Sequence, residues 1–305
     1  MRVEFVVVIA TSGRPKLLRK TLASLGECAL PEGYRETVVV ENGAKGNVEE
    51  IVRGAPQKLR TRYMYVAEGN QSGALNAARA TLGECFIFFT DDDVRPEPGV
   101  LCAYADAAER NGPGHFFGGP TAVEYEAAPP AWLIPYFPPS ARGWEWNGNG
   151  HHVDVPEFLG FNWGAWASDI RAAGGFDSNR GPGAKSGSTG YESDMQRRLL
   201  QRGLKGIYLP EARVWHYVPK ERCSEQWAIQ RNFRIGVQEG IVAIQSGAGG
   251  AIARWPARRK ILTGIMRTML RSIAGNHEQK FLAKYCLNFD RGFLKGMGEM
   301  MNNMK

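Results

Sequence analysis

Apolar and polar residues alternate in blocks along the first two thirds of the chain. Val3 to Ala10 is a nearly continuous apolar run that is rich in β-branched residues, which predicts a strand buried on both faces. Thr11-Ser12-Gly13 ends this run, and Pro15 stands where helices often begin. Leucines then recur at helical spacing, so the first unit is predicted to be a strand followed by a helix.

Three further strands and a further helix are expected along the chain. Strands are expected at Thr37–Val40, Arg62–Ala67 and Cys85–Phe89, and an alanine-rich helix is expected at Ser72–Leu82. Alternating strands and helices of this length predict a parallel sheet with right-handed crossovers. Because ligands bind such sheets at the carboxyl ends of the strands, the polar residues that end each strand are expected to share one cleft.

The middle of the chain has less periodicity. Pro129 to Gly150 is rich in Pro, Gly, Trp and Asn and is expected to be a long functional loop. The next expected elements are a glycine-rich loop, a helix and two short strands, at Gly181–Gly190, Glu192–Gln201, Gly206–Leu209 and Arg213–Tyr217.

From Ser224 onward the pattern is helical, with an apolar stripe between Ile261 and Ile273. Between Ala251 and Asn276 there are Lys and Arg residues but no acidic residue. One interpretation is a helix that packs its stripe on its own domain and leaves a basic face in water. The other is a peripheral contact between these helices and an anionic membrane.

Composition narrows the class of protein only slightly. The 305 residues carry a net charge of +7, which suits an anionic ligand, a nucleic acid or an acidic membrane. The 5 cysteines include no CxxC pair, so neither a disulfide framework nor a zinc site is indicated. The apolar run Phe5–Ala10 is too short for a signal peptide, and the expected location is cytoplasmic, with the inner face of the membrane as the alternative.

Three consecutive aspartates, Asp91-Asp92-Asp93, follow the strand at Cys85–Phe89. Adjacent carboxylates repel each other unless a cation or solvent neutralises them. Mg²⁺ and Mn²⁺ bind carboxylate oxygens together with the oxygens of a diphosphate. A solvated acidic turn would be the simpler explanation, but the position after a buried strand favours a metal site.

Two further positions could carry chemistry. Glu192 and Asp194 begin a predicted helix, where the helix dipole alone would favour acidic residues. Glu192 could instead be a general base that accepts a proton from a hydroxyl group. His216 ends a predicted strand between two aromatic residues, which suits either a packed core histidine or a metal ligand.

Two nucleotide-binding motifs are excluded. Gly181 to Ser186 has the Lys-Ser pair of a P-loop, but Ala184 and Asn179 stand at the two positions where that motif requires glycine. No GxGxxG sequence follows the first strand, which argues against a dinucleotide-binding Rossmann domain.

Taken in order, these segments resemble the inverting family 2 glycosyltransferases over about residues 3–218. The segments that carry the resemblance are VVVIATSGRPKLLRKTLASL, VVVENG, NQSGALNAARATLGECFIFFTDDDVRPEPGVL, GGFDSN, GYESDMQRRLLQRG and ARVWH. Glu41 stands where the family more often has Asp, and Tyr191-Glu192 stands where it usually has Glu-Asp.

The resemblance implies a role for each matching residue. Glu192 would be the catalytic base, and Asp93 and His216 would hold the metal, Mn²⁺ or Mg²⁺. Trp163, Trp166 and Asp194 would contact the acceptor. The donor would be bound or supported by Thr11, Arg14, Glu41, Asn76, Arg79, Asp91 and Asp92.

The fold that the resemblance implies is α/β of the GT-A type, a Rossmann-like and mostly parallel sheet flanked by helices. A donor half at 1–120, an acceptor half at 121–218 and a C-terminal helical region at 219–305 are expected. The implied activity is inverting transfer from a nucleoside-diphosphate sugar, UDP-sugar first, to a saccharide, lipid-linked or other hydroxyl acceptor. A sugar nucleotidyltransferase and a non-catalytic nucleotide-binding or basic binding protein are the alternatives, and no nucleic acid partner is expected.

Overall fold

The computed structural model describes residues 2–148, 150–155, 158–184, 189–245, 263–266, 268, 270–271 and 274–303. The chain forms two compact units that interleave along the sequence. Unit 1 comprises Met1–Glu124, Pro139–Gly183 and Gly190–Val218, and unit 2 comprises Tyr125–Pro138, Ala184–Thr189 and Pro219–Lys305. The expected donor half and most of the expected acceptor half both lie in unit 1.

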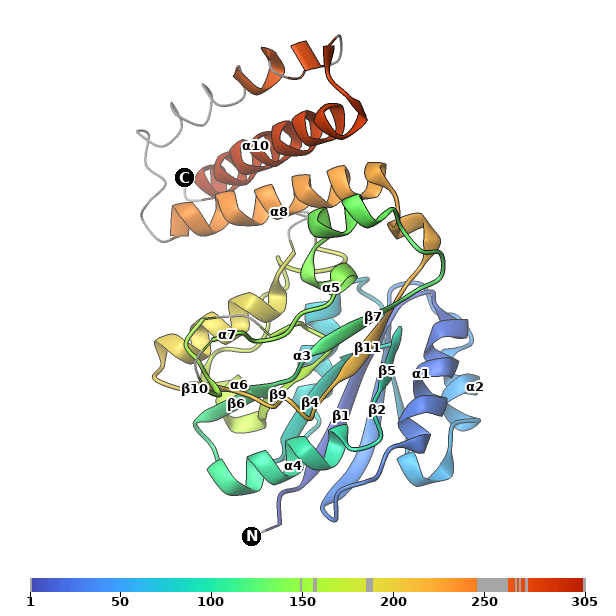
Figure 1. Ribbon diagram of the computed structural model, residues 1–305. Coiled ribbons are helices and arrows are strands. Elements are labelled where there is room, and N and C mark those ends of the chain that lie inside the picture. The colour runs from blue at the N-terminus through green and yellow to red at the C-terminus, as the bar shows by residue number, and fades with distance from the viewer. Residues whose placement is uncertain are drawn as a thin grey trace. The chain divides into compact units, whose positions relative to one another are not determined.

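A large sheet forms the centre of unit 1, with strand order β3-β2-β1-β4-β9-β6-β10-β8 (Figure 1). Most neighbouring strands are parallel, but β9 runs antiparallel to both β4 and β6, and β8 runs antiparallel to β10. The strands are β1 Phe5–Thr11, β2 Tyr34–Asn42, β3 Arg62–Val66, β4 Phe86–Asp91, β6 His115–Gly118, β8 His152–Val153, β9 Trp163–Trp166 and β10 Lys205–Tyr208.

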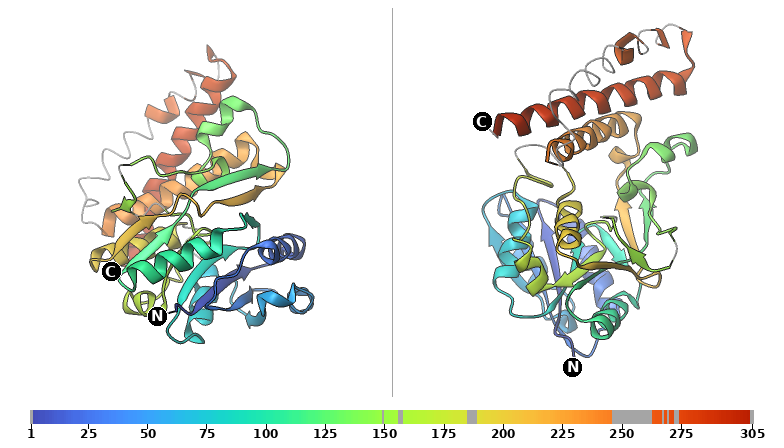
Figure 2. Two further views of the ribbon diagram at one scale, coloured as in Figure 1. Left: turned by 60° about the horizontal axis from the view of Figure 1, so that its bottom comes forward. Right: turned by 90° about the vertical axis from the view of Figure 1, so that its left-hand side faces the viewer.

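Helices cover both faces of this sheet, as Figures 1 and 2 show. Alternate side chains of β1 enter different cores, with Phe5, Val7 and Ile9 on one face and Val6, Val8 and Ala10 on the other. The first face packs against α1 Pro15–Glu27, α2 Val48–Arg53 and α4 Val100–Asn111, and the second against α3 Gln71–Ala80, α6 Ala167–Ala172 and α7 Tyr191–Gln201. The predicted α/β class is confirmed, and burial on both faces explains the continuous apolar strands.

A second, three-stranded sheet in unit 1 has the order β5-β11-β7. Its strands are β5 Val94–Pro96, β7 Thr121–Tyr125 and β11 Val214–Val218. Along β11 the side chains of Val214, His216 and Val218 are buried, whereas those of Trp215 and Tyr217 are half-buried on the opposite face. This alternation, which strand geometry requires, separates His216 from its two aromatic neighbours.

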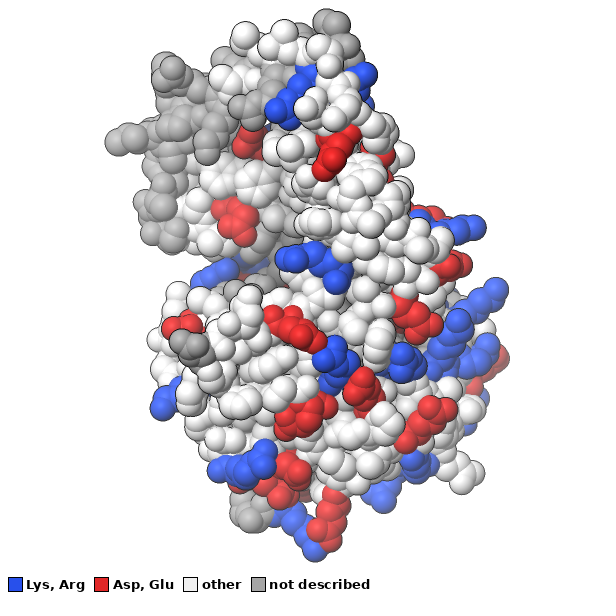
Figure 3. Space-filling model, viewed as in Figure 1, with Lys and Arg blue, Asp and Glu red and all other residues white. Residues whose placement is uncertain are grey.

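Charged side chains of both signs lie beside one another on the face of unit 1 that Figure 3 shows. Among the charged side chains of unit 1, Arg62 pairs with Glu36 at 2.7 Å and Arg213 with Glu145 at 2.7 Å. The net charge of +7 therefore does not produce a uniformly basic surface on this face.

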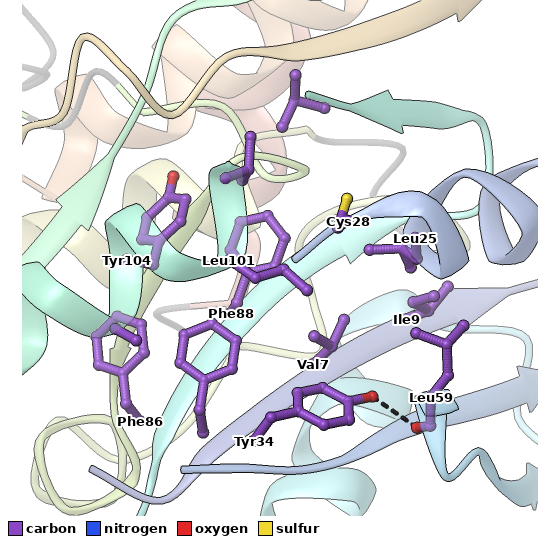
Figure 4. Packing of buried hydrophobic residues seen from close by; sticks show 14 of the residues in the cluster. Val7, Ile9, Leu25, Cys28, Tyr34, Leu59, Phe86, Phe88, Leu101 and Tyr104 are labelled. Atoms are coloured by element: carbon purple, nitrogen blue, oxygen red, sulfur yellow. Dashed lines mark hydrogen bonds between the residues drawn. The ribbon is translucent and has the colours of Figure 1, made fainter. Parts of the chain in front are cut away.

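The core beneath α1 and α4 is aromatic and closely packed (Figure 4). The rings of Phe88 and Tyr104 lie 4.6 Å apart between their centroids. At the opposite end of this cluster the buried hydroxyl of Tyr34 donates to the carbonyl of Leu59 at 2.6 Å, so its polar atom is satisfied.

The segment Pro129–Gly150 is less irregular than the sequence predicts. It contains a 3₁₀ helix, η2 Ala131–Tyr136, and a short helix, α5 Pro139–Arg142. Pro130 and Pro139 precede or begin these turns, positions where proline is tolerated because no helical N–H bond is lost.

Unit 2 contains η2, η3 Lys220–Arg222, α8 Glu225–Gln245 and α10 His277–Asn303. Helices α8 and α10 lie side by side (Figures 1 and 2) and approach so closely that an added Cβ at Gly240 would lie 2.2 Å from the carbonyl oxygen of Phe293. Most of the basic stretch Ala251–Asn276 lies outside the described residues. Among the described helices, none has the length and apolarity needed to span a bilayer.

Candidate active site

The candidate site lies at the carboxyl ends of β1, β2 and β4. Strand β1 pairs in parallel with both neighbours, so that Ala10 lies opposite Asp91 and Thr11 opposite Glu41. The polar residues that end these strands are therefore at one edge of the sheet, as the sequence pattern predicts.

Asp92 is fully buried and is held by the last residue of β1 and by a residue of the turn that follows. The hydroxyl of Thr11 donates to Oδ2 of Asp92 at 2.5 Å, and Nη2 of Arg14 lies 2.5 Å from Oδ1. Arg14 also pairs through Nη1 with Oδ2 of Asp93. One guanidinium thus partly compensates two adjacent carboxylates, which explains why Arg14 is needed at this turn.

Asp93 also faces His216, which reaches the site from β11. The Nε2 atom of His216 lies 3.4 Å from Oδ1 of Asp93, and Nδ1 lies 2.6 Å from the carbonyl oxygen of Ser140. The imidazole stacks on the ring of Phe161 at 4.7 Å between centroids. Because a carbonyl can only accept, Nδ1 carries the proton, and Nε2 is directed at a carboxylate.

Burial makes ionisation of these aspartates unfavourable. Burial and the neighbouring charge of Asp93 raise the pKa of Asp91 to about 7. Burial also raises the pKa of Asp92 to about 6, against the opposing effect of Arg14. The cluster is therefore short of positive charge at neutral pH, and a divalent cation would relieve that deficit.

Gln71 is a residue of this site that the sequence did not single out. It is the first residue of α3, and its Nε2 atom donates to Oδ1 of Asp91 and to the hydroxyl of Tyr191, both at 2.9 Å. Tyr191 is the first residue of α7 and is buried, and this burial raises the pKa of its hydroxyl well above the ordinary value. The feature of the sequence that could have identified Gln71 is its position at the start of a predicted helix, shortly after a predicted strand.

Glu192 follows Tyr191 in the first turn of α7 and is half-buried. The helix begins after Gly190, whose φ of 78° is in the left-handed region that favours glycine. The charge of Glu192 contributes to the raised pKa of Tyr191, together with those of Asp91 and Asp93. The candidate base and the aspartate cluster therefore share one electrostatic environment.

Glu41 reaches the expected edge of the sheet, but its carboxylate turns into the protein. One oxygen accepts from the backbone N–H of Gly46 and the other from the hydroxyl of Tyr63, each at 2.6 Å. Only 1% of the side chain is exposed. In this arrangement Glu41 fixes the shape of the loop after β2.

Three other candidates do not join the cluster; Asn76 and Asp194 make structural contacts, and Arg79 lies at the far end of its helix. Both amide atoms of Asn76 bond to the backbone of Phe176 at 2.8 Å. Arg79 is in the last turn of α3, about 12 Å along the helix axis from Gln71. The carboxylate of Asp194 lies among Arg180, Arg197 and Arg198, at 3.5, 3.7 and 2.9 Å.

The structure does not support the expected acceptor wall at Trp163 and Trp166. Trp163 is fully buried in β9 and stacks on Phe89 at 5.0 Å, and Trp166 packs edge-on against Phe86. The reason is that β9 is inserted between β4 and β6, which places both indoles in the core.

The residues of this site suit a divalent metal ion that takes some of its ligands from the protein and the rest from a bound substrate. The described residues contain no group of three or more His, Cys, Asp or Glu side chains that could hold a metal ion by themselves. Asp93 and His216 supply one carboxylate and one imidazole, and Ser140 fixes the ring in the way that partners of metal-binding histidines do. Mg²⁺ commonly takes one or two carboxylates and completes its ligands with phosphate oxygens.

Fold and site together define an α/β protein with a cluster of acidic residues at the carboxyl edge of a mostly parallel sheet. Residues 6–165 match glycosyl transferase family 2. The chain belongs to this family. It is also 25% identical, over 79% of its length and 75% of the relative's, to the succinoglycan biosynthesis protein ExoM of Rhizobium meliloti (strain 1021).

Solved structures share the fold at low sequence identity. One is a mannosyltransferase, PcManGT from Pyrobaculum calidifontis in complex with GDP-Man and Mn²⁺, with a TM-score of 0.60, 16% identity and coverage of 100% of this chain and 89% of that one. Another is GalNAc-T7 with UDP, GalNAc and Mn²⁺, with a TM-score of 0.53, 12% identity and coverage of 78% and 51%. They are GT-A glycosyltransferases, and the expected GT-A fold is confirmed.

Proposed function

We propose that this protein transfers a sugar, with inversion, from a nucleoside-diphosphate sugar to a hydroxyl group of a saccharide, lipid-linked or other glycoconjugate acceptor. A UDP-sugar is the first donor to test. The observation that carries the proposal is the pairing of Asp93 and His216 beside the buried aspartates, since two electron-rich groups 3.4 Å apart suit a shared cation.

Asp93 and His216 would hold Mn²⁺ or Mg²⁺, with the diphosphate of the donor supplying further oxygen ligands. When bound, the metal supplies positive charge that stabilises the leaving nucleoside diphosphate. Arg14 and Asp91 lie beside this position and would contact the donor. Thr11 and Asp92 are buried, so they would support the donor side by holding Arg14 in place. Arg14 in particular can pair with a phosphate oxygen in addition to the aspartates, because its guanidinium has five donors.

Glu192 would act as the base. Its carboxylate would accept the proton of the acceptor hydroxyl while the hydroxyl oxygen forms a bond to the anomeric carbon. The bond from that carbon to the diphosphate oxygen breaks on the opposite face, and its electron pair leaves with the nucleoside diphosphate. One displacement of this kind inverts the anomeric configuration and requires no covalent intermediate with the protein.

A donor screen tests this function. Purified protein would be mixed with UDP-, GDP-, ADP- and dTDP-sugars in Mn²⁺, Mg²⁺ or EDTA, and thermal shift and nucleoside diphosphate release would be measured. We expect one donor to stabilise the protein and to release its diphosphate slowly in metal but not in EDTA. If no donor does so while Asp93→Ala melts like the wild type under every condition, the proposal is wrong.

We also propose that the C-terminal region contacts the inner face of a membrane. Met266 and Leu270 are large apolar residues that are 63% and 66% exposed, and the surrounding segment Ala251–Asn276 is basic and contains no acid. Flotation with phosphatidylglycerol vesicles should recover the protein at low salt, and phosphatidylcholine vesicles should not. Equal recovery with both lipids, or with neither, would contradict an electrostatic membrane contact.

A further inference from the structure

The ring of Phe161 lies against the imidazole of His216, although the proposed chemistry assigns it no part. Phe161 is in a turn at residues 159–162, which the N–H of Asn162 closes by donating to the carbonyl oxygen of Leu159 at 2.9 Å. Only 4% of Phe161 is exposed. The two rings stack with 4.7 Å between their centroids and 11° between their planes. Phe161 therefore covers one face of the histidine in the candidate metal pair.

The stack is one of two constraints on this imidazole. Nearly parallel rings at this distance are in contact, so the ring of Phe161 limits rotation of the imidazole out of its plane. The second constraint is the bond from Nδ1 of His216 to the carbonyl oxygen of Ser140 at 2.6 Å, which decides how the ring is turned within that plane. Together they direct Nε2 at Oδ1 of Asp93, 3.4 Å away.

Phe161 is itself anchored to the strand that ends in Asp91. Its carbonyl oxygen accepts a bond from the buried hydroxyl of Thr90 at 2.9 Å. Thr90 immediately precedes Asp91 in β4 and lies opposite Ile9 of β1. The backbone that carries the Phe161 ring is therefore fixed to the same strand as the aspartate cluster.

Asn162 secures the other end of the turn. It is fully buried, and its Nδ2 atom donates to the carbonyl oxygens of Pro120 and Ala212, both at 2.9 Å. Its Oδ1 atom accepts from the hydroxyl of Tyr104 at 2.8 Å. Ala212 lies just before β11, the strand that carries His216. Because these bonds are buried and costly to break, the turn is a rigid support for the stacked ring.

The Phe161 ring also limits the access of water to the metal pair. The side chains of His216 and Asp93 are only 6% and 3% exposed. Electrostatic attraction between a cation and its ligands is screened less in such a site than in water. A smaller side chain at position 161 would leave space beside the imidazole, where the ring could tilt or solvent could enter. Both changes would weaken the hold of the pair on a cation.

We infer that Phe161 is a positioning residue for His216, which it holds in the plane where Nε2 can share a divalent cation with Asp93. The inference rests on the proposed function, because it requires His216 to bind the metal. Phe161 itself touches neither the metal nor the sugar. Loss of a group that orients a metal-binding histidine typically weakens metal binding by about 10- to 100-fold, and Phe161 should be at the lower end because it makes no hydrogen bond to the ring.

The first test needs no metal. Proton–nitrogen correlation spectra of the full-length protein in EDTA, at a pH of about 8.5 where histidines are neutral, show which ring nitrogen carries the proton. His216→Asn identifies the signal of His216. The wild type should show one form, with the proton on Nδ1. Phe161→Leu should show a mixture of both forms, because the tilted ring loses its fixed bond to Ser140.

Phe117→Leu is the matched control. Phe117 is fully buried in the same core cluster as Phe161 and also stacks on a histidine, His115. That histidine begins β6, whereas the candidate site lies at the carboxyl ends of its strands. A loss of core packing without a loss of positioning should therefore affect both variants alike.

Metal affinity is the second measurement. Mn²⁺ alone would be titrated into each protein, and the free ion would be followed by electron paramagnetic resonance. Phe161→Leu should bind Mn²⁺ about tenfold more weakly than the wild type. Phe117→Leu, and Phe161→Tyr, which keeps a ring on the imidazole, should bind like the wild type. Pulsed measurements detect the nitrogen of a coordinated imidazole, and this signal should be reduced in Phe161→Leu and absent in His216→Asn.

Mixed proton positions together with weaker Mn²⁺ binding in Phe161→Leu alone support the inference. Wild-type affinity in Phe161→Leu, or weaker binding with a single proton position, would overturn it and leave the proposed function intact. No nitrogen signal in the wild type would overturn both the inference and the assignment of His216 to the metal. If Phe161→Leu does not fold by circular dichroism, Phe161→Met takes its place. The donor screen uses no Phe161 variant, so sugar transfer is judged separately.

Discussion

Gln71 donates from Nε2 to Oδ1 of Asp91 and to the hydroxyl of Tyr191, at 2.9 Å in both cases. The amide thus connects the aspartate cluster to the start of the helix that carries Glu192. Since one bond leads to a half-buried carboxylate and the other to a buried hydroxyl, both should be costly to break. Gln71 is therefore expected to hold the donor side and the base in a fixed relation.

Gln71→Leu tests this connection. Leucine fills similar space without hydrogen bonds, so the variant should fold and lose about 10- to 100-fold in kcat/KM, as expected for one or two bonds to charged or buried groups. Steady-state kinetics with the donor found in the screen would measure the effect. Gln57→Leu, at an exposed position, is the control. Normal kinetics in Gln71→Leu would show that the bridge is dispensable.

Glu192→Gln removes the proposed base and preserves the size of the side chain. Transfer should fall by about two orders of magnitude or more, because general base catalysis typically contributes that much. Affinity for the nucleoside diphosphate with Mn²⁺ should change little. Single-turnover transfer and calorimetry separate the two quantities. Retention of more than a tenth of the activity would assign the base to another residue.

Asp194→Asn should affect stability instead of chemistry. Three arginines surround the carboxylate, and Nη1 of Arg198 also donates to the carbonyl oxygen of Gly175 at 2.8 Å. Loss of the negative charge removes the ion pairs of Arg197 and Arg198, whereas Arg180 keeps Asp177 at 3.3 Å, so the cost should be about 2–4 kcal/mol in the free energy of unfolding. Urea unfolding measures this change. A variant with normal stability and reduced acceptor affinity would restore Asp194 to the acceptor site.

The aspartate cluster should make the metal-free protein less stable as pH rises. The pKa of Asp91 is about 7 in the folded protein and about 3.8 in a model compound. Between these values the folded chain binds more protons than the unfolded chain, so stability decreases as pH increases. Melting temperatures in EDTA should show this slope, and Asp91→Asn should reduce it.

Addition of Mn²⁺ provides the complementary observation for Asp91. A metal binds the ionised carboxylates, so the stabilisation that it produces should increase as pH rises from about 5 to about 7. Melting curves of the wild type and Asp91→Asn would be recorded in parallel. The difference between the two proteins removes the contributions of other titrating groups. Identical slopes for the two proteins would contradict the assigned pKa of this site.

Contact between α8 and α10 depends on glycine. An added Cβ would lie 2.2 Å from a backbone oxygen at Gly240 and 2.0 Å from one at Gly292, so neither position can accept a side chain without separating the helices. Gly240→Leu should therefore increase hydrogen exchange throughout both helices. Gly83→Leu is the matched control, because a Cβ at Gly83 meets nothing within 4 Å. Unchanged exchange in Gly240→Leu would contradict this packing.

The sequence by itself determined the class of fold and the centre of the site. Apolar runs such as Val3–Ala10 required strands buried on both faces, and the register of parallel strands then placed Asp91 near Thr11. The strand that carries His216 was evident from its pattern, whereas a role for His216 at the site came from the resemblance to the family. These features follow from the local periodicity of apolar residues and from the rules that govern how successive strands and helices connect.

Tertiary structure alone decided how individual side chains are used. The inserted strand β9 buried Trp163, and contacts distant in sequence turned Glu41 inward and joined Gln71 to Tyr191. Such outcomes depend on which segments meet across the sheet, and composition or spacing carries no record of that.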